Sequence, residues 1–159
     1  GGLPVGAYGG KLEIMSEVSP LGRKVTQAGT LSGNPLAMHA GLSQLLELDK
    51  PEVYERLERI SADLEEGLAD NLKRLNLPFR LNRVGAMLCL FFTDAQVCDF
   101  PTAASSDTER FRRYFWESLE RGVYLAPSQF ECMFPSLAHT DEDIATTLKV
   151  NYDAMKASL

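Results

Sequence analysis

Apolar residues recur at helical spacing in two stretches of the first half of the chain. The first stretch begins at Asn34-Pro35, where asparagine can cap free backbone amides and proline suits the first helical position, and its pattern predicts a helix to about Leu48. After a break at residues 49–51, apolar residues follow at every third or fourth position to about Leu75, with charged residues between them. This second pattern predicts a long amphipathic helix with one face against another part of the protein.

Two short segments then indicate extended strands. Residues 79–84 and 86–92 are separated by Gly85, and the second run is apolar without alternation, which is typical of a strand covered on both faces. Residues 93–105 contain two aspartates, a proline and a serine and are expected to form a loop. Residues 123–125 have the composition of a further strand.

Two more helices are indicated by the residues that would begin them. Ser106-Asp107-Thr108-Glu109 fits a capping box and would open a helix that ends at Gly122. Residues 140–143 place three acids at the positive end of the last helix. The apolar stripe of that helix consists of Ile144, Leu148, Tyr152 and Met155.

The order of these elements predicts two parts. From residue 51 onward the order is helix, two strands, helix, one or two strands and helix. We therefore expect residues 51–159 to form a small carboxy-terminal α+β domain, with helices against one face of a mostly antiparallel sheet. Residues 1–50 offer a glycine-rich start, a short amphipathic piece at 12–18 and one helix, and are expected to be the incomplete tail of a larger domain.

Charge and hydropathy narrow the functional classes. The 159 residues include 16 basic and 22 acidic side chains, and the net charge of −6 argues against binding to nucleic acids or anionic membranes, which requires a basic face. No apolar run approaches the roughly 20 residues needed to cross a bilayer. The first residues do not resemble a signal peptide and include no initiator methionine, so we expect the chain to begin inside a longer protein.

The three cysteines, Cys89, Cys98 and Cys132, are odd in number and irregularly spaced. A disulfide framework would require an even number, and a zinc site would require closely spaced pairs with histidines nearby. We therefore expect three reduced and mostly buried thiols in a cytosol-like compartment.

Three segments are candidates for chemistry. The glycine-rich residues 1–11 fail as a phosphate loop, because Lys11 is followed by leucine, and fail as a dinucleotide fingerprint, so a tight turn that leads into a strand is favoured. Residues 27–37 place hydroxyls and amides just before a helix, which would suit an anion. The alternative, that Ser32 or Asn34 only caps the helix, stays equally open.

The third segment, residues 126–131, holds Glu131 among aromatic and apolar neighbours. Such a carboxylate needs a partner if it is buried, and an exposed glutamate in a turn is the alternative that the residues alone favour. His39 and His139 are expected to be solvated or to cap neighbouring residues, since no second ligand or nucleophile accompanies either one.

Taken together, these segments resemble one family over essentially the whole chain, in order and in spacing. The matching stretches are Gly2-Leu3-Pro4-Val5-Gly6-Ala7-Tyr8-Gly9-Gly10, Gln27-Ala28-Gly29-Thr30-Leu31-Ser32-Gly33-Asn34-Pro35, Ala126-Pro127-Ser128-Gln129-Phe130-Glu131 and Ala138-His139-Thr140-Asp141-Glu142-Asp143. They resemble the glutamate-1-semialdehyde 2,1-aminomutase family. Gly-Asn-Pro alone is shared with many related aminotransferases, whereas its combination with Thr-Leu-Ser and Ser-Gln-Phe-Glu is much more specific.

The resemblance implies a fold-type I enzyme of the α/β class that uses pyridoxal phosphate and works as a homodimer, with each active site built from both subunits. The family converts glutamate 1-semialdehyde to 5-aminolevulinate for tetrapyrrole synthesis. The amino (pyridoxamine phosphate) form of the cofactor gives its nitrogen to the aldehyde carbon and takes back the neighbouring nitrogen, so no outside amino donor is used. The implied location is the cytoplasm, or the plastid stroma in a photosynthetic eukaryote.

The resemblance also implies site residues. Gly29 and Thr30 would hold the cofactor phosphate of the partner subunit, and Glu131 would face the substrate. The family's Schiff-base lysine lies a few residues before the glycine-rich turn, hence upstream of Gly1, and neither Lys11 nor Lys24 can replace it. We therefore expect this chain to be inactive alone. Thr26 stands where the family often has a tyrosine, so an aromatic contact from the neighbouring subunit is not carried over.

Two alternatives compete with this interpretation. An ω-aminotransferase of the same fold would need an external amino donor, and the Ser128-Gln129-Phe130-Glu131 stretch favours the aminomutase over it. A non-catalytic interaction domain derived from the same fold is the second alternative. A Gly-Lys dipeptide just upstream of Gly1 would exclude it.

Overall fold

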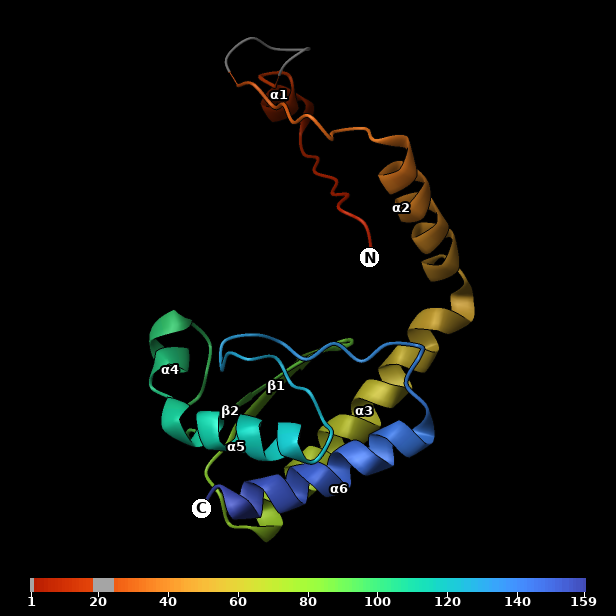
Figure 1. Ribbon diagram of the computed structural model, residues 1–159. Helices are drawn as coiled ribbons and strands as arrows, with labels where there is room; N and C mark the ends of the chain where they lie inside the picture. Colours follow the sequence, from red (N-terminus) through yellow and green to blue (C-terminus); the bar gives the residue numbers. More distant parts are fainter. Residues whose placement is uncertain (1, 19–24) are drawn as a thin grey trace. The chain divides into compact units, whose positions relative to one another are not determined.

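A computed structural model describes residues 2–18 and 25–159 (Figure 1). The chain divides into two compact units, Gly1–Pro51 and Glu52–Leu159, and each is described by itself. Gly1 and Lys24, on which two of the expectations rest, lie outside the described residues.

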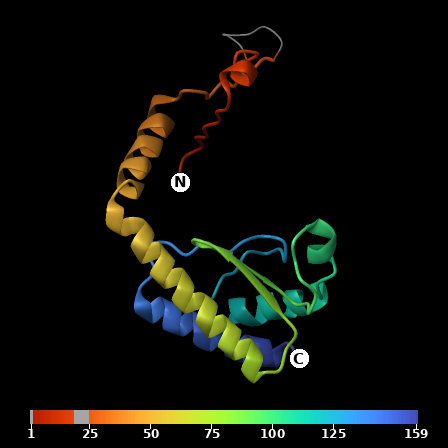
Figure 2. The same cartoon turned by 180° about the vertical axis from the view of Figure 1, so that it is seen from behind.

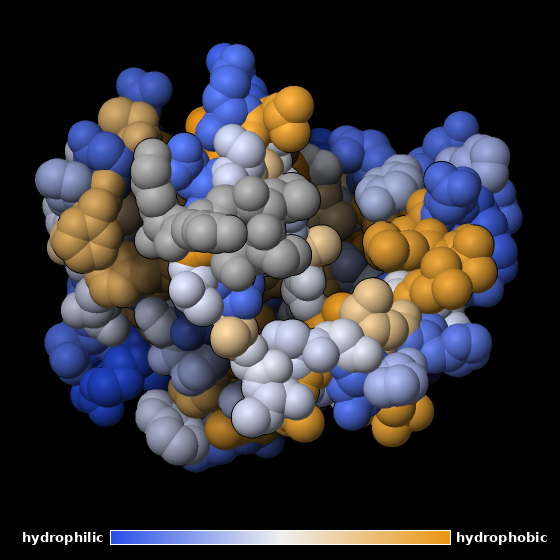
Figure 3. All heavy atoms as spheres, turned by 90° about the horizontal axis from the view of Figure 1, so that it is seen from above, coloured by the Kyte–Doolittle hydropathy of each residue, from blue (hydrophilic) through white to orange (hydrophobic). Residues whose placement is uncertain are grey.

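The first unit contains α1 (Leu12–Met15) and α2 (Pro35–Leu48). Helix α2 begins as expected from its first residues: Asn34 Oδ1 accepts hydrogen bonds from the amides of Leu36 (3.0 Å) and Ala37 (3.2 Å). Its apolar side chains stay mostly exposed, and Ala37 is its buried residue. The exposed ones are Leu36, Met38, Leu42, Leu45 and Leu46. In the space-filling view apolar side chains gather on the right-hand side, over α2 (Figure 3).

The second unit contains α3 (Pro51–Arg74), β1 (Arg80–Val84), β2 (Met87–Phe91), α4 (Phe100–Ala104), α5 (Thr108–Glu120) and α6 (Asp141–Ala157). The two strands form an antiparallel hairpin with Arg80 opposite Phe91 and Val84 opposite Met87. Gly85 makes the turn between them with φ +55°, a conformation that glycine adopts without strain.

The core of this unit joins the hairpin to three helices. Leu72 of α3, Leu90 of β2, Tyr114 of α5 and Met155 of α6 belong to one buried cluster. A second cluster pairs Leu64 and Leu68 of α3 with Leu88 of β2. Figure 1 and Figure 2, which view the molecule from opposite sides, both show the hairpin above α5 and α6. The α+β arrangement expected for this part of the chain is therefore present.

A buried chain of amides ties the three helices together. Asn71 Nδ2 donates to the carbonyl of Leu148 (2.8 Å) and to Asn151 Oδ1 (2.9 Å). Asn151 Nδ2 in turn donates to the hydroxyl of Tyr114 (3.0 Å). Because these groups are buried, each depends on the others for its hydrogen bonds.

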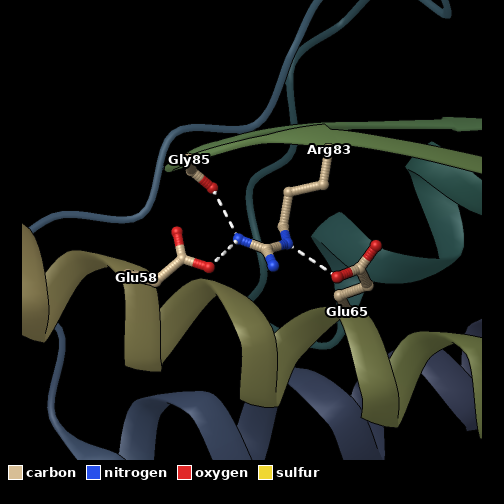
Figure 4. Close-up of polar contacts among 4 residues, drawn as sticks. All are labelled: Glu58, Glu65, Arg83 and Gly85. Carbon is tan, nitrogen blue, oxygen red and sulfur yellow. Dashed lines mark hydrogen bonds and ion pairs between the residues drawn. The ribbon is translucent and has the colours of Figure 1, made fainter.

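Arg83 links the hairpin to α3 (Figure 4). Its guanidinium donates to Glu65 Oε2 (2.6 Å), to Glu58 Oε1 (2.7 Å) and to the carbonyl of Gly85 (3.1 Å). These two carboxylates raise the pKa of Arg83 by hydrogen bonding, so its charge is retained.

Three expectations about local structure were wrong. Residues 123–125 form no strand; the edge of β2 is met instead at Met133, which exchanges backbone hydrogen bonds with Leu88. The loop at 93–105 contains the short helix α4, because Asp99 and Thr102 form a reciprocal capping box. The cap of α5 is Asp107, which accepts from the amide of Arg110, and not a box that begins at Ser106.

The cysteines also differ from the expectation. All three are free thiols, but only Cys89 is buried, whereas Cys132 is partly exposed and Cys98 is exposed. Cys98 lies in the polar segment before α4, where its backbone amide donates to Thr102 Oγ1 (3.1 Å) and where nothing covers its side chain.

Candidate functional site

A hollow of about 730 Å³ lies in the first unit, in front of the amino-terminal end of α2. One wall is the extended segment Pro4–Tyr8, and the other is the loop that leads into the helix. The loop residues that line it are Gln27, Gly29, Thr30, Leu31, Ser32, Gly33 and Asn34. The glycine-rich start and the anion-seat segment singled out from the sequence therefore meet in one place.

The extended wall packs closely on α2. A Cβ atom on Gly41 would lie 2.9 Å from Val5 Cγ1, so the absence of a side chain at this position lets the segment approach the helix. A larger residue at position 41 would displace Val5 and change the shape of the hollow.

Two glycines shape the loop itself. The amide of Ser32 donates to the carbonyl of Gly29 (3.0 Å), and the amide of Asn34 donates to that of Leu31 (3.0 Å). A Cβ atom on Gly29 would lie 2.8 Å from Ser32 Oγ, and Gly33 has φ +72°. A side chain at position 29 would therefore displace the Ser32 hydroxyl, and position 33 favours glycine for its backbone conformation.

Several hydrogen-bond donors of the loop have no partner among the described residues. Within the part that the structure describes, no internal hydrogen bond uses the hydroxyls of Thr30 and Ser32 or the backbone amide of Thr30. Helix α2 is capped by Asn34, so capping does not use the hydroxyls of Thr30 and Ser32 or the amide of Thr30. Free donors at the positive end of a helix of 14 residues fit a phosphate dianion.

Lys11 does not contribute to this hollow. It precedes α1 and is not among the residues that line the space in front of α2. Thr26 is exposed beside the loop. No cation of the described residues therefore supplements the hydroxyl and amide donors in the hollow.

Glu131 lies in the second unit, on a turn held firmly against β2. The amide of Glu131 donates to the carbonyl of Ser128 (3.2 Å), and the amide of Phe130 donates to Ser128 Oγ (3.2 Å). The ring of Phe130 packs on Phe100 of α4 at a centroid distance of 5.9 Å. The carboxylate itself is exposed and has no hydrogen-bond partner among the described residues, so it is available to a ligand.

Gln129 anchors this turn, and sequence reasoning did not single it out. Its side chain is 4% exposed and its Nε2 donates to the backbone carbonyl of Leu90. Its Oε1 is buried without a partner in the described residues. The sequence places this residue in the Ser128-Gln129-Phe130-Glu131 stretch, where an amide between a serine and an aromatic residue could equally well face water.

The other candidates have structural roles. His139 Nδ1 accepts a hydrogen bond from the amide of Ser136 (3.0 Å), the capping role expected of it. Among the described residues, no three histidine, cysteine or acidic side chains gather where they could hold a metal ion. No helix in residues 2–18 and 25–159 is both long and apolar enough to span a membrane.

Comparison with known proteins identifies the family. The model of the class-III aminotransferases matches residues 1–155. The chain belongs to this family. Glutamate-1-semialdehyde 2,1-aminomutase 2 of Brevibacillus brevis is 64% identical over 156 residues, and the alignment covers 98% of this chain and 36% of that protein. The aminomutase of Pelodictyon phaeoclathratiforme is 58% identical over 158 residues and is covered to the same 36%.

Solved structures of transaminases and of an aminomutase confirm the fold class. An omega-transaminase from Sphaerobacter thermophilus has a TM-score of 0.77 at 20% identity, over 94% of this chain and 34% of that chain. A glutamate-1-semialdehyde-aminomutase from Pseudomonas aeruginosa has a TM-score of 0.74 at 25% identity, over 83% and 29%. A lysine-to-alanine variant of that aminomutase has been solved in complex with PMP. The chain thus spans about a third of the length of the relatives it matches.

Proposed function

We propose that this chain is part of a glutamate-1-semialdehyde 2,1-aminomutase, which converts glutamate 1-semialdehyde to 5-aminolevulinate with pyridoxal phosphate. The observation that carries the proposal is the identity of 64% to a protein of that name over nearly the whole chain. The Ser-Gln-Phe-Glu turn and the loop before α2, the segments most specific to the resemblance, are both ordered parts of the structure.

The loop before α2 would hold the cofactor phosphate. The hydroxyl and amide of Thr30 and the hydroxyl of Ser32 would donate to the phosphate oxygens, and the helix dipole would favour the negative charge. A Cβ atom on Gly29 would lie too close to the Ser32 hydroxyl, so glycine at this position leaves that hydroxyl in place. When bound, the cofactor supplies the exchangeable amino group and the electron sink for the reaction.

Glu131 would act on the substrate side. Its exposed carboxylate can accept hydrogen bonds from an ammonium group of the substrate and orient it. The turn that carries it is fixed to β2 by Gln129 and by the bridge between Leu88 and Met133, so the position of the carboxylate is set before the substrate arrives.

The remaining parts of the proposal concern the whole protein. We infer a homodimer in which Gly29 and Thr30 serve the partner's active site, and a lysine outside this chain that holds the cofactor covalently. The first unit would then be the tail of the large cofactor-binding domain, and the isolated chain would be inactive. The expected location is the cytoplasm, or the plastid stroma in a photosynthetic eukaryote.

The test is an assay of the full-length protein with glutamate 1-semialdehyde and no added amine. We expect 5-aminolevulinate to form at a rate that added amino donors do not increase. A strict requirement for an external amine would identify an ω-aminotransferase and overturn the proposal. Glu131→Gln tests the role of the carboxylate and should lose product formation. Glu120→Gln, on the exposed end of α5, is the matched control.

A further inference from the structure

Cys89 and Cys132 come from distant parts of the chain and meet at the edge of the hairpin. Leu88 and Met133 form an antiparallel bridge. The amide of Leu88 donates to the carbonyl of Met133 (3.1 Å), and the amide of Met133 donates to the carbonyl of Leu88 (2.7 Å). Cys89 follows Leu88, and Cys132 precedes Met133. Residues next to such a bridge lie opposite each other, and their side chains point to the same face.

The contacts of Cys89 agree with this register. Its Sγ lies 3.5 Å from the carbonyl oxygen of Glu131 and 3.7 Å from that of Gln129, so the thiol points at the turn that carries Cys132. Burial first, and then the neighbouring Cys132 thiol, raises the pKa of Cys89 to about 11. Cys89 is therefore a buried, protonated thiol whose neighbour across the turn is a second thiol.

Cys132 is the accessible member of the pair. It is partly exposed and lines a cavity of about 210 Å³ together with His139 and Phe134. A small oxidant can reach it there, whereas Cys89 is 8% exposed. Opposite residues of an antiparallel pair have Cα atoms about 4.5–5.5 Å apart, within the roughly 4.4–6.8 Å that a disulfide spans.

We propose that Cys89 and Cys132 are a site of reversible oxidation, at which a peroxide converts the two thiols into a disulfide. The Cys132 thiolate attacks a peroxide oxygen, the O–O bond breaks, and a sulfenic acid and hydroxide result; the hydroxide combines with the proton that the thiol released. The Cys89 sulfur then displaces the hydroxyl group, which leaves as water with the Cys89 proton. One peroxide is reduced to two waters, and two thiols are oxidised to one disulfide.

This oxidation site does not depend on the proposed function, but a disulfide here would form beside Glu131, the residue proposed to face the substrate. The disulfide would link β2 covalently to the residue next to Glu131, in place of the thiol contacts to the carbonyls of Gln129 and Glu131. Cys98 is the internal control, since it is the more exposed thiol and lies on another segment without a thiol partner in the described residues.

The experiment treats the folded 159-residue chain with hydrogen peroxide, alkylates the remaining thiols in denaturant and maps the peptides. We expect two of the three thiols to be lost to a single cross-link between Cys89 and Cys132, with Cys98 alkylated and both lost thiols restored by dithiothreitol. A cross-link through Cys98, oxidation of the thiols without a cross-link, or no loss of thiols would overturn the proposal.

Serine variants decide the assignment. Cys132→Ser, at a partly exposed position, should retain the circular dichroism spectrum of the unsubstituted chain and lose the intramolecular cross-link completely. Cys98→Ser should form it at an unchanged rate. Cys89→Ser should also lose it, and the Cys132→Ser result stands by itself if the buried serine prevents folding. An intramolecular disulfide that persists in Cys132→Ser contradicts the pairing.

Discussion

At the scale of single residues, the candidate site consists of groups that the chain itself leaves unused. In the loop before α2, Asn34 caps the helix, and the hydroxyls of Thr30 and Ser32 have no hydrogen-bond partner within residues 2–18 and 25–159. The carboxylate of Glu131 likewise has no hydrogen-bond partner among the described residues, while the nearby Gln129 is buried and holds the turn. In both the loop before α2 and the turn at Glu131, residues that hold the backbone in place lie next to residues whose functional groups are available.

Thr30→Val tests the phosphate seat in the full-length protein. Valine keeps the shape but removes one donor to a dianion, a loss of roughly 1.5–3 kcal/mol, so cofactor affinity should fall about ten- to a hundredfold. The cofactor spectrum measured during dialysis reports the loss. Thr26→Val, beside the loop but outside the hollow, is the matched control and should retain the cofactor.

A mixed dimer tests whether Thr30 acts across the subunit interface. One subunit carries Thr30→Val and the other lacks the proposed upstream lysine, so a trans arrangement leaves one site intact and about half of the native activity. A cis arrangement damages both sites. Residual activity at or below the level of the Thr30→Val homodimer would show that Thr30 serves the site of its own chain.

At the scale of elements, the helix boundaries follow from capping chemistry and the contacts between helices follow from buried polar groups. Helix α6 begins at Thr140, whose hydroxyl accepts from the amide of Asp143 (3.2 Å) while the Asp143 carboxylate accepts from the amide of Thr140 (2.8 Å). The expected acidic start of this helix is confirmed, and the reciprocal cap explains where it begins.

The cap of α6 should make stability depend on pH in the acid range. Hydrogen bonds from Thr140, with a smaller contribution from His139, lower the pKa of Asp143. A carboxyl group with a lowered native pKa stabilises the fold above its unfolded pKa of about 3.9, and this contribution is lost as the pH falls through the native value. Asp143→Asn should be less stable than the unsubstituted chain at neutral pH and equal to it in strong acid, as measured by urea unfolding. A stability difference that does not change with pH would contradict this.

Asn71→Leu tests the amide chain between α3, α5 and α6. The substitution leaves the carbonyl of Leu148 and the Oδ1 of Asn151 without their donor in a buried place, which should cost about 1–3 kcal/mol of unfolding free energy. Asp70→Leu, on the exposed side of the same helix turn, removes only a surface pair with Lys73 (3.7 Å) and should change stability much less. Equal effects of the two variants in urea unfolding would rule out a special role for the buried amide.

At the scale of the whole molecule, the two units differ in how much they bury. The second unit contains both apolar clusters, whereas the buried apolar residue of the first, among those described, is Ala37. The exposed leucines of α2 agree with the expectation that this part of the chain carries apolar positions without partners of its own.

Hydrogen exchange should follow this difference. We expect the slowest amides in residues 79–92 and 144–155, where strand pairing and a buried helix face restrict opening, and fast exchange in residues 2–18. The measurement is exchange of the isolated chain resolved by peptide mass. Equal or stronger protection in residues 2–18 would contradict the expected order of stability.

The isolated chain should not hold pyridoxal phosphate covalently at one specific lysine. Lys11 lies outside the hollow, and the hydroxyl and amide donors proposed there would bind only the phosphate. Incubation with the cofactor, borohydride reduction and peptide mapping is the measurement. Stoichiometric labelling of a single lysine would contradict the proposal that the covalent residue lies outside this chain.

The sequence by itself determined the helices α2, α3, α5 and α6 and the hairpin, because caps, apolar periodicity and turn glycines act over a few residues. The family followed from the resemblance of whole sequence stretches. The sequence could not predict that residues 123–125 stay unpaired while Met133 meets β2, because edge pairing depends on which distant segment arrives there. For the same reason only the tertiary structure brought Asn71 to Asn151, buried Gln129 beneath Glu131 and set Cys89 opposite Cys132. These contacts join residues 39 to 80 positions apart, and only packing of the folded chain selects them.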